Sequence, residues 1–222
     1  MADFWPCLFD RSAHTGIDAH YFYQALWAFR KIHDRNVRTH VDVGSQVQFV
    51  GLLTTVTRVI FLDIRALSIG IPNYQGLASS VVALPFGDRS IHSLSILHVI
   101  EHIGLGRYGD PIDPNGTAKA AQEIVRVLAP GGRAYISVPV GRPRVQFNGQ
   151  RVFTAADVLK LFNGLDLVEM AMVDASGKFH DDVKPEFADI SEVGQGSDFG
   201  LGLFGFEKAA RVIATERSRC PN

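Results

Sequence analysis

Apolar side chains recur along the chain with two spacings, one typical of helices and one typical of buried strands. Residues 18–35 have the helical spacing, and the first of them, Asp18, is a suitable N-cap. The apolar face predicted for this helix consists of Phe22, Ala25, Leu26, Phe29 and Ile32. The remaining large aromatic side chains fall elsewhere on the helix, where they either pack or line a pocket: Tyr21, Tyr23 and Trp27.

Strands and helices are predicted to alternate over the rest of the chain. The apolar runs that predict strands cover residues 38–44, 56–64, 92–98, 133–140, 165–174 and 201–209. Residues 116–132 predict a helix stopped by Pro130-Gly131-Gly132, and residues 154–164 predict another that begins with a capping-box pattern at Thr154 and Asp157. Residues 175–199, rich in Gly, Asp and Ser, predict a long loop.

This alternation predicts an α/β fold with a mostly parallel sheet and helices on both faces. Ligands of such sheets bind where the strands end at their carboxyl side. Gly44, Asp63, His98 and the turn at residues 139–144 stand at these ends. We therefore expect the functional site there.

Composition narrows the class of partner. The 222 residues are enough for one domain, and a formal net charge of −1 argues against nucleic acid, which normally requires a basic surface. Cys7 and Cys220 form no disulfide framework, and neither a signal peptide nor a membrane span is apparent, so we expect a cytoplasmic protein. The apolar face of the first helix fits either a cover for the site or an oligomer contact.

The segment 96–106 contains a pattern with two interpretations. His98, Glu101 and His102 spell H-x-x-E-H, by which one class of zinc peptidases holds its metal. That interpretation needs both imidazoles on one helical face and a third ligand, for which no adjacent signature exists. The same residues also fit the turn that follows a buried strand at a cofactor site.

Four segments in order resemble class I S-adenosylmethionine-dependent methyltransferases. They are VDVGSQ (41–46), FLDI (61–64), LPFGDRSIHSLSILHVIEH (84–102) and EIVRVLAPGGRAYISVP (123–139), and a narrower likeness is to an uncharacterised methyltransferase-like branch. The resemblance implies a Rossmann-like fold whose seven-stranded sheet is closed by an antiparallel C-terminal hairpin. It divides a single domain over residues 1–222 into an N-terminal helical extension (1–38), a cofactor-binding core (39–140) and an acceptor-side segment with the closing hairpin (141–222).

The resemblance also implies which residues hold S-adenosylmethionine. They are Asp42, Gly44, Ser45, Asp63, Ile64, Ser80 and Val81. A glycine after the first strand lets the backbone approach the cofactor, and a carboxylate ending the second can accept both ribose hydroxyls. The sequence departs from the family at several places: Gln46 and Gln48 replace loop glycines, Ser80 replaces the carboxylate that contacts adenine, and His92 stands where an Asp is common.

On this interpretation His98 is the candidate general base for a hydroxyl acceptor, or else a structural histidine that bonds the loop. Candidate acceptor-binding residues are Asp110, Asp113, Arg142 and Arg144. The two aspartates alternatively initiate turns or hold a divalent ion, and the arginines either recognise an anionic group or form surface ion pairs. We place no metal ligand among them.

The expected function is methyl transfer from S-adenosylmethionine to a small-molecule or glycan acceptor, and the arginines favour an anionic one. The altered glycine loop favours an alternative, a methyltransferase-like binding or structural protein without catalysis. The zinc hydrolase of His98, Glu101 and His102 is the remote alternative.

Overall fold

The computed structural model describes residues 15–65, 67–187 and 199–210. Its main sheet has eight strands in the order β3-β2-β1-β4-β5-β10-β8-β9. Their bounds are β1 Thr39–Val43, β2 Arg58–Asp63, β3 Tyr74–Ala78, β4 Ile91–Leu97, β5 Leu128–Gly141, β8 Asp166–Val173, β9 Phe179–His180 and β10 Phe199–Glu207. Strands β1 to β5 pair in parallel, and β10 lies antiparallel between β5 and β8. The predicted mostly parallel sheet with its antiparallel C-terminal hairpin is confirmed, and the two-residue β9 adds an eighth strand.

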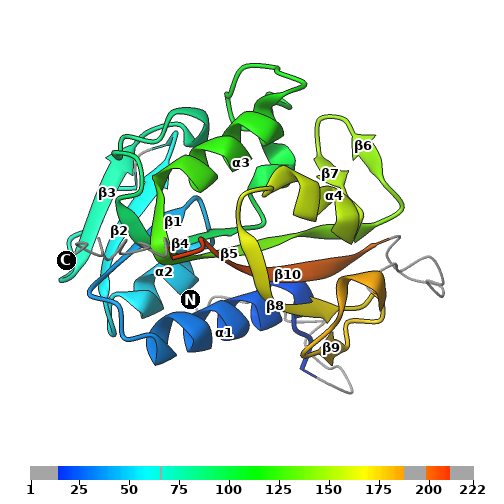
Figure 1. Ribbon diagram of the computed structural model, residues 1–222, viewed down its shortest axis with the longest axis horizontal. Helices are drawn as coiled ribbons and strands as arrows, with labels where there is room; N and C mark the ends of the chain where they lie inside the picture. The colour runs from blue at the N-terminus through cyan, green and yellow to red at the C-terminus, as the bar shows by residue number, and fades with distance from the viewer. Residues whose placement is uncertain (1–14, 66, 188–198, 211–222) are drawn as a thin grey trace, which may run out of the picture.

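Helices cover both faces of the sheet. Figure 1 shows α1 (Ala19–Asp34) and α2 (Val47–Leu53) on one side, and α3 (Gly116–Val127) and α4 (Ala155–Leu161) on the other. Each pair packs on its own apolar cluster, one around Trp27 and Phe49, the other around Ile124 and Phe162. A separate hairpin, β6 (Arg144–Gln146) with β7 (Gln150–Val152), follows the end of β5. Three 3-10 turns complete the described elements: η1 Val81–Ala83, η2 Ile100–His102 and η3 Pro185–Phe187.

Helix starts were predicted well because capping is local. The side chain of Asp18 accepts the Tyr21 amide at 3.2 Å, and Thr154 and Asp157 form a reciprocal capping box at the start of α4. The predicted end of the helix over 116–132 is wrong, because α3 stops at Val127 and Leu128 is already extended. Pro130 disfavours a helical residue before it, so the Pro-Gly-Gly segment lies within β5 instead.

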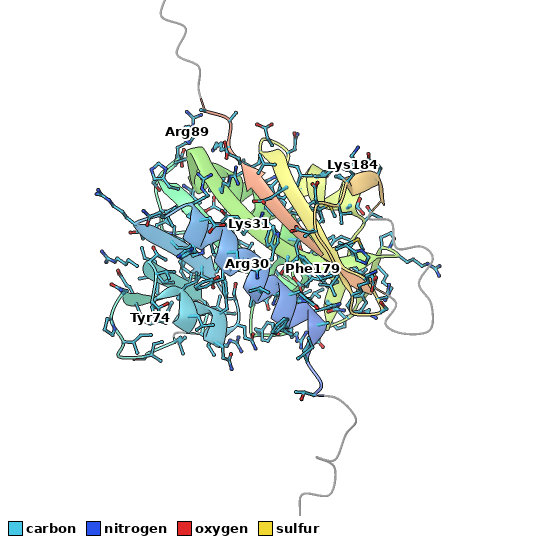
Figure 2. The ribbon with its side chains drawn as sticks, turned by 90° about the horizontal axis from the view of Figure 1, so that it is seen from below. Arg30, Lys31, Tyr74, Arg89, Phe179 and Lys184 are labelled. Atoms are coloured by element: carbon cyan, nitrogen blue, oxygen red, sulfur yellow. The ribbon has the colours of Figure 1, made fainter. Side chains whose placement is uncertain are left out.

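The predicted apolar face of α1 is wrong in part: Ile32 is buried, and Ala25 and Phe29 pack against the same cluster, but Phe22 and Leu26 do not. The buried residues of α1 are Gln24, Trp27, Ala28 and Ile32, whereas Phe22 and Leu26 are 49% and 37% exposed. Trp27 packs edge-on against Tyr135 of β5 with ring centroids 5.9 Å apart. Burial of the large Trp27 indole on the sheet stabilises an orientation of α1 that is rotated from the one predicted by the spacing of its apolar residues. Figure 2, seen from below, shows α1 lying across this face of the sheet, with Phe179 beside it.

Two other differences concern exposed segments. The region predicted as a loop over 175–199 contains β9 and η3, while residues 188–198 lie outside the described residues, as do Cys7 and Cys220. Strand β3 was not predicted because it is an edge strand in which no residue is fully buried. None of the described helices is both long enough and apolar enough to cross a membrane.

Candidate functional site

A cavity of about 630 Å³ opens where β1, β2 and β4 end. Nine of the residues proposed from the sequence line it: Gly44, Ser45, Asp63, Ile64, Ser80, Val81, His98, Asp110 and Asp113. Asp42, Arg142 and Arg144 are not among the lining residues. Parallel strands end at one edge of the sheet, and the segments that follow them meet there.

The turn after β1 forms the floor of the cavity. Gly44 has φ +66°, and a Cβ added to it would lie 3.3 Å from both γ-carbons of Val99 and 3.7 Å from Asp63 Oδ2. A side chain is therefore disfavoured at this position by both backbone and space. The next residue, Ser45, accepts the Leu97 amide at 3.1 Å, which ties the turn to the end of β4.

The end of β2 presents a carboxylate to the cavity. Oδ1 of Asp63 accepts the backbone amide of Arg65 at 2.7 Å and its Nε at 3.3 Å. Within the described part of the chain, no hydrogen bond reaches Oδ2, and the side chain is only 15% exposed. Asp63 thus has one carboxylate oxygen available for a ligand hydroxyl.

Ser80 and Val81 lie beside Asp63 at the start of η1. The Asp63 carbonyl accepts the Ser79 amide at 3.1 Å, and Ser80 Oγ accepts the Val82 amide at 3.4 Å. Ser80 therefore caps the turn with its own side chain. Ile64 is 40% exposed and lines the same part of the cavity.

Asp42 lies behind this wall, fully buried in a polar network between β1 and β4. Its carboxylate accepts the Ser45 amide at 3.0 Å and the hydroxyl of Ser95, which also contacts His40 at 2.8 Å. Burial raises the pKa of Asp42 to about 6, against the opposing effect of the Ser95 and Ser45 hydrogen bonds. Burial also lowers the pKa of His40 to about 3. In this geometry Asp42 supports the turn from behind.

His98 stands directly after β4 with an unusual backbone. Its φ is +56°, in the left-handed region that favours glycine. Its Nδ1 lies 2.6 Å from Oε1 of Glu101, a side chain with no exposed surface. The rings of His20 and Tyr21 from the first turn of α1 lie against the His98 ring, with centroids 5.7 Å and 5.2 Å away.

His102 belongs to the same cluster. Its Nδ1 donates to the Gly149 carbonyl at 2.7 Å, and its Nε2 lies 3.7 Å from Glu101 Oε1. Burial lowers the pKa of His102, while the nearby Glu101 carboxylate opposes that shift. The contact with Gly149 attaches the hairpin β6–β7 to the site.

The H-x-x-E-H segment does not form the helix that the zinc interpretation requires. Residues Ile100–His102 make a single 3-10 turn, and His98 precedes it in a left-handed conformation. Both imidazoles approach the same glutamate. Across the described residues, no group of three His, Cys, Asp or Glu side chains is arranged to hold a metal ion.

The loop over residues 104–115 forms another wall, and its aspartates bond the loop itself. Asp110 accepts the Gly104 amide at 2.6 Å, and Asp113 accepts the Asn115 amide at 2.9 Å and Lys119 Nζ at 2.8 Å. These contacts match the turn-forming interpretation of the two aspartates. The Lys119 and Asn115 bonds lower the pKa of Asp113.

Tyr108 in this loop was not predicted. Its ring lies under the guanidinium groups of Arg65 and Arg107, at 4.6 Å and 5.1 Å from the centroid. Because Arg65 follows β2 and Tyr108 follows η2, the stack joins two walls of the cavity. No sequence pattern predicts this pairing, since Arg65 and Tyr108 are far apart along the chain and both lie in loops.

The arginines after β5 lie elsewhere. Arg144 Nη1 donates to the Arg142 carbonyl at 2.9 Å, and the Arg144 guanidinium lies 5.8 Å from the Phe199 ring centroid. Arg151 donates to the Ile103 carbonyl at 2.6 Å, which binds β7 to the turn after β4. His180 of β9 does not line the cavity, and its Nε2 lies 2.7 Å from Asp174 Oδ2.

Solved structures similar to this chain share the class I methyltransferase fold. The [4+2]-cyclase SpnF matches with a TM-score of 0.60 at 14% identity, covering 86% of this chain and 81% of SpnF. The N-methyltransferase NodS from Bradyrhizobium japonicum WM9 matches with a TM-score of 0.58 at 15% identity, over 86% and 98% of the two chains.

A third structure carries ligands. The 1,6-didemethyltoxoflavin-N1-methyltransferase of Burkholderia thailandensis, with 1,6-didemethyltoxoflavin and S-adenosylhomocysteine bound, matches with a TM-score of 0.52 at 14% identity, over 84% and 78% of the chains. These likenesses establish the fold. Among curated proteins none matches.

One family model matches residues 55–184, more than half of the chain. The matched region includes β2, the His98–Glu101–His102 cluster and the hairpin β6–β7. The chain therefore has the class I methyltransferase fold and belongs to the family described as Caenorhabditis protein of unknown function, DUF268.

Proposed function

We propose that the cavity binds S-adenosylmethionine and that the protein transfers its methyl group to a hydroxyl of a small-molecule or glycan acceptor. The observation that carries the proposal is the cradle at the ends of β1 and β2. Gly44, at φ +66°, leaves room that a Cβ would fill, and Asp63 Oδ2 stands across this space. Asp63 would accept the ribose hydroxyls there, beside Ile64, Ser80 and Val81.

When bound, S-adenosylmethionine supplies a methyl group to the acceptor oxygen and retains the electron pair of the broken carbon–sulfur bond. His98 stands at the other end of the cradle, after β4. Its Nε2 takes the proton that the acceptor hydroxyl releases, which produces an imidazolium. The aromatic side chains of Tyr21 and Tyr108 line the cavity beside His98.

A neutral acceptor fits this wall better than an anionic one. Arg142 and Arg144 do not line the cavity. Among the described residues, the arginine that does line it is Arg65. Arg65 is itself committed to Asp63 and Tyr108. A cytoplasmic location stays a prediction, as does self-association through the half-exposed Phe22 and Leu26 of α1.

A second candidate function is binding without catalysis. The observation that favours it is Gln46, whose side chain lines the cavity where methyltransferases of this class have a glycine. The fold also supports other chemistry, since one similar structure is a [4+2]-cyclase.

Calorimetric titration with S-adenosylmethionine and S-adenosylhomocysteine tests the proposal. We expect a dissociation constant on the order of micromolar, corresponding to about −8 kcal/mol. Asp63→Ala should weaken binding roughly 100-fold, because it removes the charge-assisted hydrogen bond at Oδ2, worth about 1.5–3 kcal/mol. Asp34→Ala is the matched control, since Asp34 lies on the far end of α1 with a 75% exposed side chain.

Equal binding by the wild type and Asp63→Ala would mean that the ligand sits elsewhere. Absence of binding by the wild type would favour the second candidate, a methyltransferase-like protein whose cavity holds another molecule or none.

A further inference from the structure

We propose that Glu101 is a positioning residue that holds the His98 ring in the tautomer protonated at Nδ1, so that Nε2 faces the acceptor without a proton. The inference rests on the proposed function and assigns a role to a side chain outside the cavity wall. His98 Nδ1 lies 2.6 Å from Glu101 Oε1.

The burial of Glu101 requires a strong donor. The side chain has no exposed surface, and two imidazoles, those of His98 and His102, lie beside its carboxylate in the described residues. A buried carboxylate without a donor is strongly destabilising. A proton on His98 Nδ1 satisfies Oε1, whereas Oε2 has no hydrogen-bond partner among the described residues. A neutral imidazole protonated at Nδ1 has its lone pair on Nε2.

His102 does not compete for this role. Its Nδ1 donates to the Gly149 carbonyl at 2.7 Å, so the neutral ring presents a lone pair at Nε2. That nitrogen is 3.7 Å from Glu101 Oε1, beyond hydrogen-bond distance. The carboxylate is therefore directed to His98.

The surroundings leave His98 Nε2 buried and, among the described residues, without a hydrogen-bond partner. The rings of His20 and Tyr21 cover the His98 ring. A lone pair that neither water nor a protein donor satisfies, in a residue of the cavity wall, suits a hydroxyl that enters with the acceptor.

The backbone of His98 gives an independent argument. Its left-handed φ of +56° suits glycine, so the imidazole is retained at a conformational cost. Its amide is fixed by the carbonyl of Ser137 at 3.1 Å and the hydroxyl of Ser137 at 3.0 Å. Ser137 Oγ in turn donates to Gln24 Oε1 at 2.6 Å. Position and tautomer of the ring are thus both determined by neighbours.

The proton balance follows from this arrangement. The acceptor O–H bond breaks as its oxygen bonds to the methyl carbon, and the proton moves to His98 Nε2. The resulting imidazolium keeps its Nδ1–H on Glu101, where the carboxylate balances the new charge.

Two-bond ¹H–¹⁵N correlation spectra of protein labelled at histidine test the inference. His98→Gln identifies the His98 signals by their loss. We expect the wild type to carry its ring proton on Nδ1 and Glu101→Gln to retain that tautomer, because the amide oxygen still accepts. In Glu101→Leu, which offers no acceptor, the ring should move to the Nε2-protonated form. Glu207→Gln, which removes a carboxylate paired with Arg133 instead, is the control and should leave the signals unchanged.

Each result decides a separate point. A wild-type ring protonated at Nε2 would overturn the inference even if Glu101→Leu failed to fold. So would an unchanged tautomer in folded Glu101→Leu. The same samples are titrated with S-adenosylhomocysteine, whose affinity should change less than twofold in the Glu101 variants because Glu101 does not line the cavity. If the wild type does not bind it, the proposed function fails, and the positioning role of Glu101 in methyl transfer fails with it whatever the tautomer.

Discussion

Replacing Asp42 with asparagine should stabilise the protein at neutral pH. Asp42 is fully buried, and burial is the main cause that raises its pKa from 3.8 to about 6. A raised pKa means that the folded state prefers the protonated form. Ionisation of Asp42 therefore costs stability, and this cost is absent below pH 3.8 and complete above pH 6.

The size of this stability change follows from the pKa shift of Asp42. About two pKa units correspond to about 3 kcal/mol, since one unit is about 1.4 kcal/mol. Asparagine can keep the network: Oδ1 still accepts the Ser45 amide, and Nδ2 donates to Ser95, which turns to donate to His40. Because the pKa of His40 is lowered to about 3, its neutral ring accepts this bond and donates from the other nitrogen to Ser93.

Urea unfolding of wild type and Asp42→Asn at several pH values measures the effect. We expect Asp42→Asn to be more stable by about 3 kcal/mol at pH 7 and by about 1 kcal/mol at pH 4.5. Asp34→Asn, on an exposed side chain, should change stability by less than about 0.5 kcal/mol at both pH values. A gain that does not depend on pH, or a loss at pH 7, would refute the reasoning.

Further predictions concern backbone and capping, all measured by thermal or urea unfolding. Gly104→Ala should cost about 3 kcal/mol or more, because Gly104 has φ +80° and its Cβ would overlap the Asp113 carbonyl; Gly51→Ala, in the open middle of α2, should instead gain about 0.5–1 kcal/mol. His98→Gly should be about 1 kcal/mol more stable than His98→Ala, the reverse of the usual order, because of the left-handed φ. Thr154→Ala should cost about 1 kcal/mol by removing the α4 cap.

The part of the cavity at the ends of β1, β2 and β4 could be predicted from the sequence because topology alone assembles it. Gly44 and His98 follow a strand and Asp63 ends one, and parallel strands bring their carboxyl ends to one edge. No side-chain detail was needed to expect these residues around one cavity. The same logic failed for Arg142 and Arg144, since the chain leaves β5 into a separate hairpin.

Contacts between loops could not be predicted. The stack of Tyr108 on Arg65 and the bond from His102 to Gly149 depend on how two loops fold at once, and neither has a periodic pattern. The face of α1 was partly mispredicted for a related reason. Several helical faces of this segment are partly apolar, and packing of Trp27 on Tyr135 selects among them.

The replacement of two loop glycines by Gln46 and Gln48 counts less strongly against cofactor binding than the sequence alone suggests. Gly44 alone in this turn has a positive φ, whereas Gln46 has φ −58° and Gln48 lies within α2, both conformations open to any side chain. Replacing the two glycines therefore leaves the path of the backbone intact and changes only what projects from it. Because Gln46 is exposed and lines the cavity, its side chain can move aside or contact the ligand. Gly44, the position in this turn whose backbone requires glycine, is a glycine in this chain, and it faces Asp63.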